Sequence, residues 1–482
     1  DDVKNYFGEK IGFLTAFMSH YTQWLIWPAF LGFCTWLNVA AEKGNPNVIL
    51  APVYAFGMAI WATLFLESWK RRENRLGLEW GVFGDAVVET VRPEYVDNPY
   101  VYRVTSPVNG KRMLYFPRLE YIKRQFISTT ASAMFIMCVI ALFIAMFAAK
   151  FVMDADPETS GSAGIVASLF NAVIVIVMGA IYKIVVAMLN EYENHRTVTE
   201  YEDALIIKTF IVQFINTFTS LFFIAFGQDL LSEAHEGVRR CVGSCMRQIQ
   251  ETLSVLFLTK LATSSVTSLL VPYFNMKFRE SIEFEGVKDE DISQLEREYL
   301  REEYELTLGP FTDYSEITLQ FAYATMFISA YPLATCMALM SNYMEMRIKT
   351  WFFCHLGRRP VPYSVNDIGS WFDILEIISY IAVLTSAGLV AFTTDLAQNI
   401  TWTGRIWMFV LFSGFIIGCK YLVQITYPRV DNEIDIQLKR NKYILDKLYN
   451  NIPDDDDTAL LENIESMAKA KLEIRINDDD PC

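Results

Sequence analysis

Long apolar runs recur along the whole chain, and they restrict its fold more than any other feature. Stretches of about 20 mostly apolar residues, the length that crosses a bilayer, are found between residues 20 and 427. Soluble domains hold roughly 45–50% apolar residues, whereas this chain holds 52%, with only 20% charged. A backbone in hydrocarbon must satisfy its own hydrogen bonds, so such runs form helices. The sequence therefore predicts an all-α, polytopic integral membrane protein.

Breaks at proline, glycine and charge clusters divide the region 20–428 into ten expected spans. The preceding segment, 1–19, is expected to be an amphipathic helix at the membrane surface, and no N-terminal signal peptide is recognised. The spans are predicted at residues 20–41, 49–70, 120–153, 163–190, 203–227, 249–276, 313–331, 333–354, 367–393 and 402–427.

The distribution of basic residues predicts which side of the membrane each loop occupies. The loop 71–119 is rich in lysine and arginine, while the loop after the third span, around Asp154–Glu158, holds no base. Basic loops stay in the cytosol, so we expect both termini there, together with the charged linker 278–311 and a helix with an acidic tail at 429–482. The exception is Arg239-Arg240, which this topology places outside.

The remaining composition bears on partners and on redox state. The net charge of −15 comes mainly from loops and from the tail, and no basic domain or Gly-rich phosphate loop is present, so nucleic acid is not an expected partner. Most of the eight cysteines lie in or beside apolar segments, where a small core side chain is expected. Cys241 and Cys245 lie four apart in a polar connection, which fits either a lumenal disulfide or one face of a helix.

Polar side chains form stripes on three of the expected spans. A single Ser or Thr in a span usually bonds back to its own helix or joins two helices. A wide stripe containing Lys260 near the middle of a span favours a hydrated groove or pore over plain packing. The residues expected to line it are Ser128, Thr129, Ser132, Thr209, Gln213, Asn216, Thr217, Ser220, Thr259, Lys260, Thr263 and Thr267.

Three carboxylates are expected inside the seventh and eighth spans. Asp313 and Glu316 are three residues apart on one helical face, and Glu345 lies in the next span. Buried carboxylates require cations, and several of them together suit calcium, which takes six to eight oxygen ligands. However, Lys349 lies four residues after Glu345, and an ammonium there would also neutralise the acids. A metal site and a buried ion-pair network fit these residues equally well.

Several motifs, spread over nearly the whole chain, resemble signatures of the anoctamin family of lipid scramblases and ion channels. They occur in the family's order. The matching segments are Asp2–Lys10, Phe65–Arg72, Glu193–Thr197, Glu200–Glu202, Cys241–Cys245, Asp313–Glu316, Gln320–Phe321, Tyr331–Ala334, Arg358–Pro360 and Asp367–Trp371. Within the family, residues 109–111, 115–117 and 296–312 resemble the intracellular and fungal scramblase branch more than the chloride channels.

The resemblance implies a homodimer of ten-span subunits that meet through the tenth span. Each subunit would form a groove from spans three to seven, along which phospholipid headgroups cross while acyl tails stay in the bilayer. Polar groups and water must accompany a charged headgroup, because it cannot cheaply enter hydrocarbon. No covalent chemistry is needed, so we expect a transport protein rather than an enzyme.

The resemblance also implies two gating calcium ions, held by five acids and an Asn. Asp313, Glu316 and Glu345 match ligand positions, but Ser264, Ser268 and Lys349 stand where the family has an Asn and two acids. Three carboxylates facing a lysine would bind calcium weakly at most, and Lys349 would act as a tethered cation in its place. A supplementary site maps to Glu67 and Glu433, with Arg429 at a position where an acid is expected.

The sequence thus supports three functions. The first is passive phospholipid scrambling with nonselective ion conduction and with weakened or absent calcium dependence. The second is an anion or cation channel on the same fold, with Lys260 providing positive potential in the pore. The third is a non-transporting membrane tether, for which the degenerate calcium site is an argument and the polar stripes are a counterargument. The endoplasmic reticulum and the plasma membrane are the expected locations.

Overall fold

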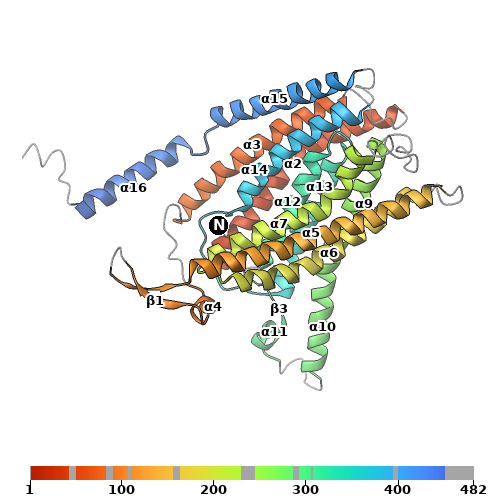
Figure 1. Ribbon diagram of the computed structural model, residues 1–482. Helices are drawn as coiled ribbons and strands as arrows, with labels where there is room; N and C mark the ends of the chain where they lie inside the picture. Colours follow the sequence, from red (N-terminus) through yellow and green to blue (C-terminus); the bar gives the residue numbers. More distant parts are fainter. Residues whose placement is uncertain are drawn as a thin grey trace, which may run out of the picture. The chain divides into compact units, whose positions relative to one another are not determined.

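The computed structural model describes residues 2–42, 50–82, 91–106, 110–155, 163–228, 245–285, 292–305, 308–394 and 400–450 (Figure 1). The chain divides into two compact units, Asp1–Pro428 and Arg429–Cys482. Cys241, the Arg239-Arg240 pair and the acidic tail lie outside the described residues. Cys245 is disulfide-bonded.

The first unit is a bundle of long helices, and most of the described chain is helical. Its helices, with their π-helical turns, are α1 (Asp2–Phe7), α2 (Glu9–Ala41), α3 (Leu50–Glu79), α4 (Pro93–Val96), α5 (Arg118–Ala155), α6 (Ala163–Glu193), α7 (Val198–Phe222), η1 (Phe223–Gly227), α9 (Cys245–Ser265), η2 (Val266–Leu270), α10 (Val271–Glu283), α11 (Gln294–Leu300), α12 (Leu308–Met326), α13 (Ala334–Trp351), η3 (Phe352–Leu356), α14 (Trp371–Gly388), η4 (Leu389–Thr393) and α15 (Trp402–Thr426). The second unit contains α16 (Asn432–Asn450).

Eight of the described helical segments are long and apolar enough to cross a membrane. They overlap the first six predicted spans and the last two. The helices at the other two predicted spans, α12 and α13, are less apolar because they carry the acidic residues discussed below. This supports a polytopic membrane protein, and the number of ten spans stays a prediction.

The borders of several loops differ from those expected. Helix α3 continues to Glu79, into the predicted loop 71–119, and α10 continues to Glu283, into the predicted linker 278–311. The rest of that linker contains α11, whose start is fixed by a capping box between Ser293 and Glu296. Helices therefore extend beyond the apolar runs, because charged residues form helices as readily once a helix has been nucleated.

Two small sheets lie outside the long helices. Strands β1 (Tyr102–Thr105) and β2 (Arg112–Tyr115) form an antiparallel hairpin before α5. Strands β3 (Glu302–Glu303) and β4 (Gly357–Arg358) pair in parallel, and so join the linker before α12 to the segment after η3.

The sixth predicted span is interrupted by the π-helical turn η2, which separates α9 from α10. Pro272 follows directly, at the start of α10. Because proline has no backbone N–H, it cannot donate to the carbonyl of Ser268, so regular α-helical bonding cannot continue through this point. Breaks of this kind often lie at functional sites. This one lies between two half-helices that face different neighbours.

The core of the first unit is formed by aromatic residues from α2, α3 and α12. Phe17, Phe65 and Phe321 are fully buried, and the ring centroids of Phe17 and Trp69 are 5.0 Å apart in an edge-to-face arrangement. Edge-to-face pairs add about 0.5–1.5 kcal/mol to the effect of burial. This rigid core supports α12, which carries part of the candidate site.

Candidate functional site

A cluster of charged side chains lies where α9, α12 and α13 meet. Lys349 of α13 forms an ion pair with Asp313 of α12, and both side chains are largely buried. The phenol of Tyr304, in the linker before α12, also donates a hydrogen bond to Asp313, at 3.1 Å. Burial raises the pKa of this phenol, and the nearby Asp313 carboxylate raises it further, so Tyr304 remains a donor. Asp313 thus has two partners within the protein.

The second half of the cluster involves Glu316 and Glu345. The Lys260 ammonium of α9 donates to the backbone carbonyl of Glu316 at 2.7 Å, and Ser264 donates to the Glu316 carboxylate at 3.5 Å. The carboxyl groups of Glu316 and Glu345 lie within hydrogen-bonding reach of each other. The three acids Asp313, Glu316 and Glu345 thus lie near two lysines, Lys260 and Lys349.

The cluster therefore contains most of the residues that the sequence analysis selected as a degenerate metal site. Lys349 lies where a second acid of the eighth span was expected, and it pairs with Asp313. Ser268 lies in the π-helical turn η2. Within the described ranges, no three His, Cys, Asp or Glu side chains are arranged to hold a metal ion. The geometry is that of an ion-pair network.

Lysines other than Lys349 contribute to this cluster, and the sequence analysis did not assign them to it. Lys260 was expected to line a groove, and its ammonium contacts α12, which is one of the spans expected to form that groove; lining by Lys260 stays a prediction. Lys183 of α6 is close enough to influence Lys260 and Glu316 electrostatically. The rule that a charge inside a span is functional would have selected Lys183, whereas the contact of Lys260 depends on the alignment of two helices.

The polar stripe of the fifth span packs against neighbouring helices. Gln213 of α7 accepts a hydrogen bond from Ser315 of α12 at 2.5 Å. Asn216 donates to the backbone carbonyl of Val175 in α6 at 2.9 Å. The other members of this stripe, Thr209, Thr217 and Ser220, are buried. In this structure the stripe therefore holds α6, α7 and α12 together.

The stripes on α5 and α9 are more open. Thr259 of α9 and Thr267 of η2 bond back to the preceding turn of their own helix and are half-buried and exposed, respectively, and Thr263 of α9 is half-buried. In α5, Thr129 is exposed and bonds back to Gln125. Ser132, on the same helix, accepts from the Tyr182 hydroxyl of α6 at 3.0 Å. Ser128 is fully buried. Lining of a transport pathway by these residues stays a prediction.

A cavity of about 880 Å³ lies beside the start of α7, and we call it the vestibule. Its walls come mainly from α5, from the first half of α7 up to Val212 and from the α6–α7 turn. Predicted groove residues Thr129 and Ser132 line it, together with charged residues that the sequence analysis did not select. The charged lining residues are Arg118, Glu193, Arg196, Glu200, Asp203 and Lys208.

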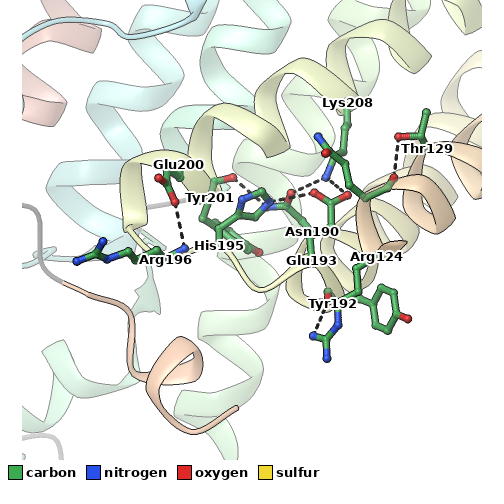
Figure 2. A network of polar contacts seen from close by, with 11 residues as sticks. Arg124, Thr129, Asn190, Tyr192, Glu193, His195, Arg196, Glu200, Tyr201 and Lys208 are labelled. Carbon is green, nitrogen blue, oxygen red and sulfur yellow. Dashed lines mark hydrogen bonds and ion pairs between the residues drawn. The ribbon is translucent and has the colours of Figure 1, made fainter. Parts of the chain in front are cut away.

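The vestibule is organised around the carboxylate of Glu193, at the end of α6 (Figure 2). This carboxylate lies 2.5 Å from the Lys208 ammonium and 3.1 Å from His195 Nε2. Lys208 also donates to the Asn190 side chain at 3.0 Å, and Asn190 donates to the Tyr201 carbonyl at 2.9 Å. The network fixes the turn between α6 and α7. From the sequence, Glu193–Thr197 was identified only as a family motif. The network could not be predicted, because its residues come from three different elements.

Neighbouring contacts connect this turn to α5 and to the segment before the hairpin. Arg124 of α5 donates to the Tyr192 carbonyl at 3.0 Å (Figure 2). Arg92 forms an ion pair with Glu191 at 2.8 Å, and its guanidinium lies 4.0 Å from the centre of the Tyr201 ring. The ends of α5, α6 and α7 are thus held together at one polar junction.

The two acids of the predicted supplementary metal site belong to different units, and the site stays a prediction. Glu67 of α3 is buried in the first unit, and Glu433 belongs to α16 in the second. Lys420 of α15, which is 1% exposed, lies close enough to Glu67 for electrostatic interaction. Its ammonium donates to the Ser379 hydroxyl of α14 at 2.8 Å. A lysine therefore accompanies Glu67, as Lys349 accompanies Asp313.

Comparison with known proteins decides the family. The model of the family described as "Anoctamin: Calcium-activated chloride channel" matches residues 3–441. The chain belongs to the anoctamin family. Among its curated anoctamin relatives, mouse anoctamin-3 is 29% identical over 82% of this chain and 46% of its own length. Mouse anoctamin-7 is 27% identical over 84% and 54%, and bovine anoctamin-4 is 27% identical over 83% and 50%.

The chain spans about half the length of these anoctamins. The match to the family model confirms the resemblance found in the sequence. The family includes calcium-activated lipid scramblases and chloride channels. Both activities operate on the membrane in which such proteins are embedded, so contact with lipid is expected for either. The choice between them has to come from the chemistry of this chain.

Proposed function

We propose that this anoctamin is a passive phospholipid scramblase whose activity does not depend on calcium, accompanied by nonselective ion conduction. The observation that carries the calcium independence is the ion pair of Lys349 with Asp313, together with the contact of Lys260 with Glu316. These lysines occupy the cluster where the family resemblance places calcium. An ammonium held by its own chain stays at the site at any calcium concentration.

A cluster that contains lysines attracts calcium less than a cluster of acids alone. Calcium binding is favoured by an excess of negative charge, and unit charges a few ångströms apart interact by several kcal/mol at intermediate dielectric. With Asp313, Glu316 and Glu345 facing Lys260 and Lys349, the formal excess is small. Desolvating calcium for so weak an attraction is unfavourable. Calcium binding should therefore be weak at most.

Support for lipid transport comes from the vestibule and from the stripes on α5 and α9. A headgroup needs polar partners along its route, and the vestibule offers charges of both signs beside the exposed side chain of Thr129. A zwitterionic headgroup carries both signs and would be matched there. A membrane tether has no need of such a cavity. The packed stripe of α7 would have to separate from its neighbours before a continuous groove forms.

An anion channel is the alternative, and the observation that favours it is the pair Lys183 and Lys260. Both are cationic side chains on candidate spans, and they are close enough to interact. Rings of basic side chains select anions in pores.

A homodimer through the tenth span belongs to either proposal. It is supported by the exposed apolar side chains of α15, which include Trp407, Leu411 and Phe415.

The proposal is tested by reconstituting the full chain into liposomes that contain a fluorescent phospholipid. Chemical quenching of the outer leaflet reports scrambling, and a parallel assay measures ion flux, each with calcium and with a chelator. We expect equal scrambling in both conditions. Strong activation by calcium would refute the calcium independence, and ion flux without scrambling would establish the channel instead.

A further inference from the structure

An open crevice of about 700 Å³ lies between the second half of the sixth predicted span and the last turns of α13. One wall is formed by Leu269, Leu270 and Tyr273. The other is formed mainly by Met344, Ile348 and Trp351. An apolar crevice of this kind at the surface of a membrane protein is suited to an acyl chain.

One charged residue interrupts the outward face of α13. Met340, Tyr343 and Met344 are 67%, 54% and 47% exposed and form an apolar stripe, and Arg347 continues it at helical spacing. The Arg347 guanidinium donates to the Tyr343 hydroxyl at 3.1 Å and lies 5.3 Å from the centre of that ring. Within the described residues no carboxylate is found within ion-pairing distance of it.

A guanidinium on a lipid-facing surface requires an anionic partner or access to the interface. In a bilayer, the abundant anion is the lipid phosphate, which guanidinium binds through two parallel hydrogen bonds. The helix continues past Trp351 as the π-helical turn η3, and the predicted span ends at residue 354. Arg347 lies seven residues before that end, about 10 Å along the axis, and a long arginine side chain can reach toward the interface from there.

We propose that this crevice binds one phospholipid, whose phosphate contacts Arg347 and whose acyl chain lies along Leu270 and Ile348. Such a lipid would be resident rather than transported. Arg347 is two residues from Lys349, a rotation of about 200° around the helix, so it faces away from the charged cluster. The inference is independent of the proposed function, since it concerns binding and requires no transport.

The position of the crevice gives the bound lipid a structural consequence. Leu269 and Leu270 belong to η2, the break in the sixth predicted span, and α13 carries Glu345 and Lys349 on its other face. A lipid between these elements would fill the space into which α10 would otherwise move. Its presence would therefore favour the position of α10 seen here.

The test is native mass spectrometry of the full chain in detergent, titrated with phosphatidylcholine or with diacylglycerol of the same acyl chains. We expect the wild type to retain phosphatidylcholine and Arg347→Gln to retain it about tenfold more weakly, as for the loss of charge-assisted hydrogen bonds. Diacylglycerol should bind weakly to both. Arg112→Gln, an exposed arginine of the hairpin, is the matched control and should behave as wild type.

A second variant tests the apolar part of the site without changing a charge. Leu270→Trp should fill the crevice and weaken phosphatidylcholine retention, while millimolar inorganic phosphate should not displace the lipid from the wild type. Equal retention by wild type and Arg347→Gln would overturn the proposal and show that Arg347 simply reaches the interface. If Arg347→Gln does not fold, unchanged retention by Leu270→Trp overturns it. Displacement by inorganic phosphate would reassign the site to a free anion.

Discussion

The charged cluster of α9, α12 and α13 and the vestibule beside α7 both pair a buried carboxylate with a lysine, but the surroundings of the two pairs differ. In the cluster, Asp313 is buried between Lys349 and Tyr304. In the vestibule, Glu193 is also buried and also has a lysine partner, Lys208, but the network lines a cavity of about 880 Å³. In one region the ion pair joins two packed helices, and in the other it lies beside an open space. Ion pairs alone therefore do not reveal which role a site has.

Removing the lysine of the cluster should give the largest effect. Among the described residues, Lys349→Ala leaves Asp313 with Tyr304 as its remaining hydrogen-bond partner, and an uncompensated buried charge costs about 3–5 kcal/mol. The midpoint of thermal unfolding in detergent should fall markedly. Lys439→Ala in α16, which breaks the exposed pair with Asp435, is the control and should change stability by less than about 1 kcal/mol. Equal effects of the two variants would contradict the closed character of the cluster.

Converting the cluster into a metal site should give the next largest effect. Ser268→Glu combined with Lys349→Asp restores acids at two positions where the family resemblance expects them. Calcium should then stabilise the protein by about 2.7 kcal/mol at a concentration one hundred times its dissociation constant. Scrambling should become calcium-dependent. Thermal unfolding with and without calcium measures the first effect, and the wild type, which should show no shift, is the reference.

Disrupting the vestibule should have a smaller effect on stability. Glu193→Gln weakens the contacts with Lys208 and His195, and a buried group without its partner costs about 1–3 kcal/mol. We expect faster proteolysis at the α6–α7 turn and altered scrambling, with the cluster intact. Glu200→Gln changes a carboxylate that lines the same cavity and accepts from the Arg196 backbone N–H at 3.1 Å but does not contact Lys208 or His195, and a neutral amide oxygen can still accept that bond, so it should be milder. A larger loss from Glu200→Gln would show that the network is centred elsewhere.

Removing one hydrogen bond from the cluster should have the smallest effect. Tyr304→Phe deletes the donor to Asp313 but leaves the pairing with Lys349, so we expect a loss of about 1 kcal/mol. Unfolding by denaturant measures it. In the Lys349→Ala background the same change should cost more, because Tyr304 is then the remaining partner of Asp313. Strict additivity would show that the two partners act independently.

Much of the membrane architecture follows from local sequence properties. The apolar runs predicted ten spans, and eight of these overlap described helical segments that are long and apolar enough to cross a bilayer. Run length and composition are local quantities, so they can be read from the sequence. The position of Lys349 beside the acids could also be predicted from the sequence, since Glu345 and Lys349 are four residues apart and share a helical face. Contacts between helices could not be predicted from the sequence. The partners of Lys260, Gln213 and Tyr304 depend on how α9, α7 and the linker align with α12.

The stripe on α7 shows why polar residues alone did not distinguish a groove from a packed interface. Gln213 and Asn216 share a helical face, as a hydrated groove requires, but Ser315 and the Val175 carbonyl satisfy them in this structure. The hydrogen bonds of a side chain to water and to a neighbouring helix have the same chemistry, so composition cannot separate them. The vestibule was missed for a related reason, since its lining comes from elements far apart in the sequence.

The lysine in the cluster also changes what can regulate the protein. A dissociable ion reports its own concentration, because the occupancy of its site follows the ratio of concentration to dissociation constant. Lys349 is covalently part of the chain, so its local concentration is constant and carries no signal. If calcium does not bind there, as we propose, control of α9, α12 and α13 would come from another source, for example from bilayer thickness acting on the break before Pro272.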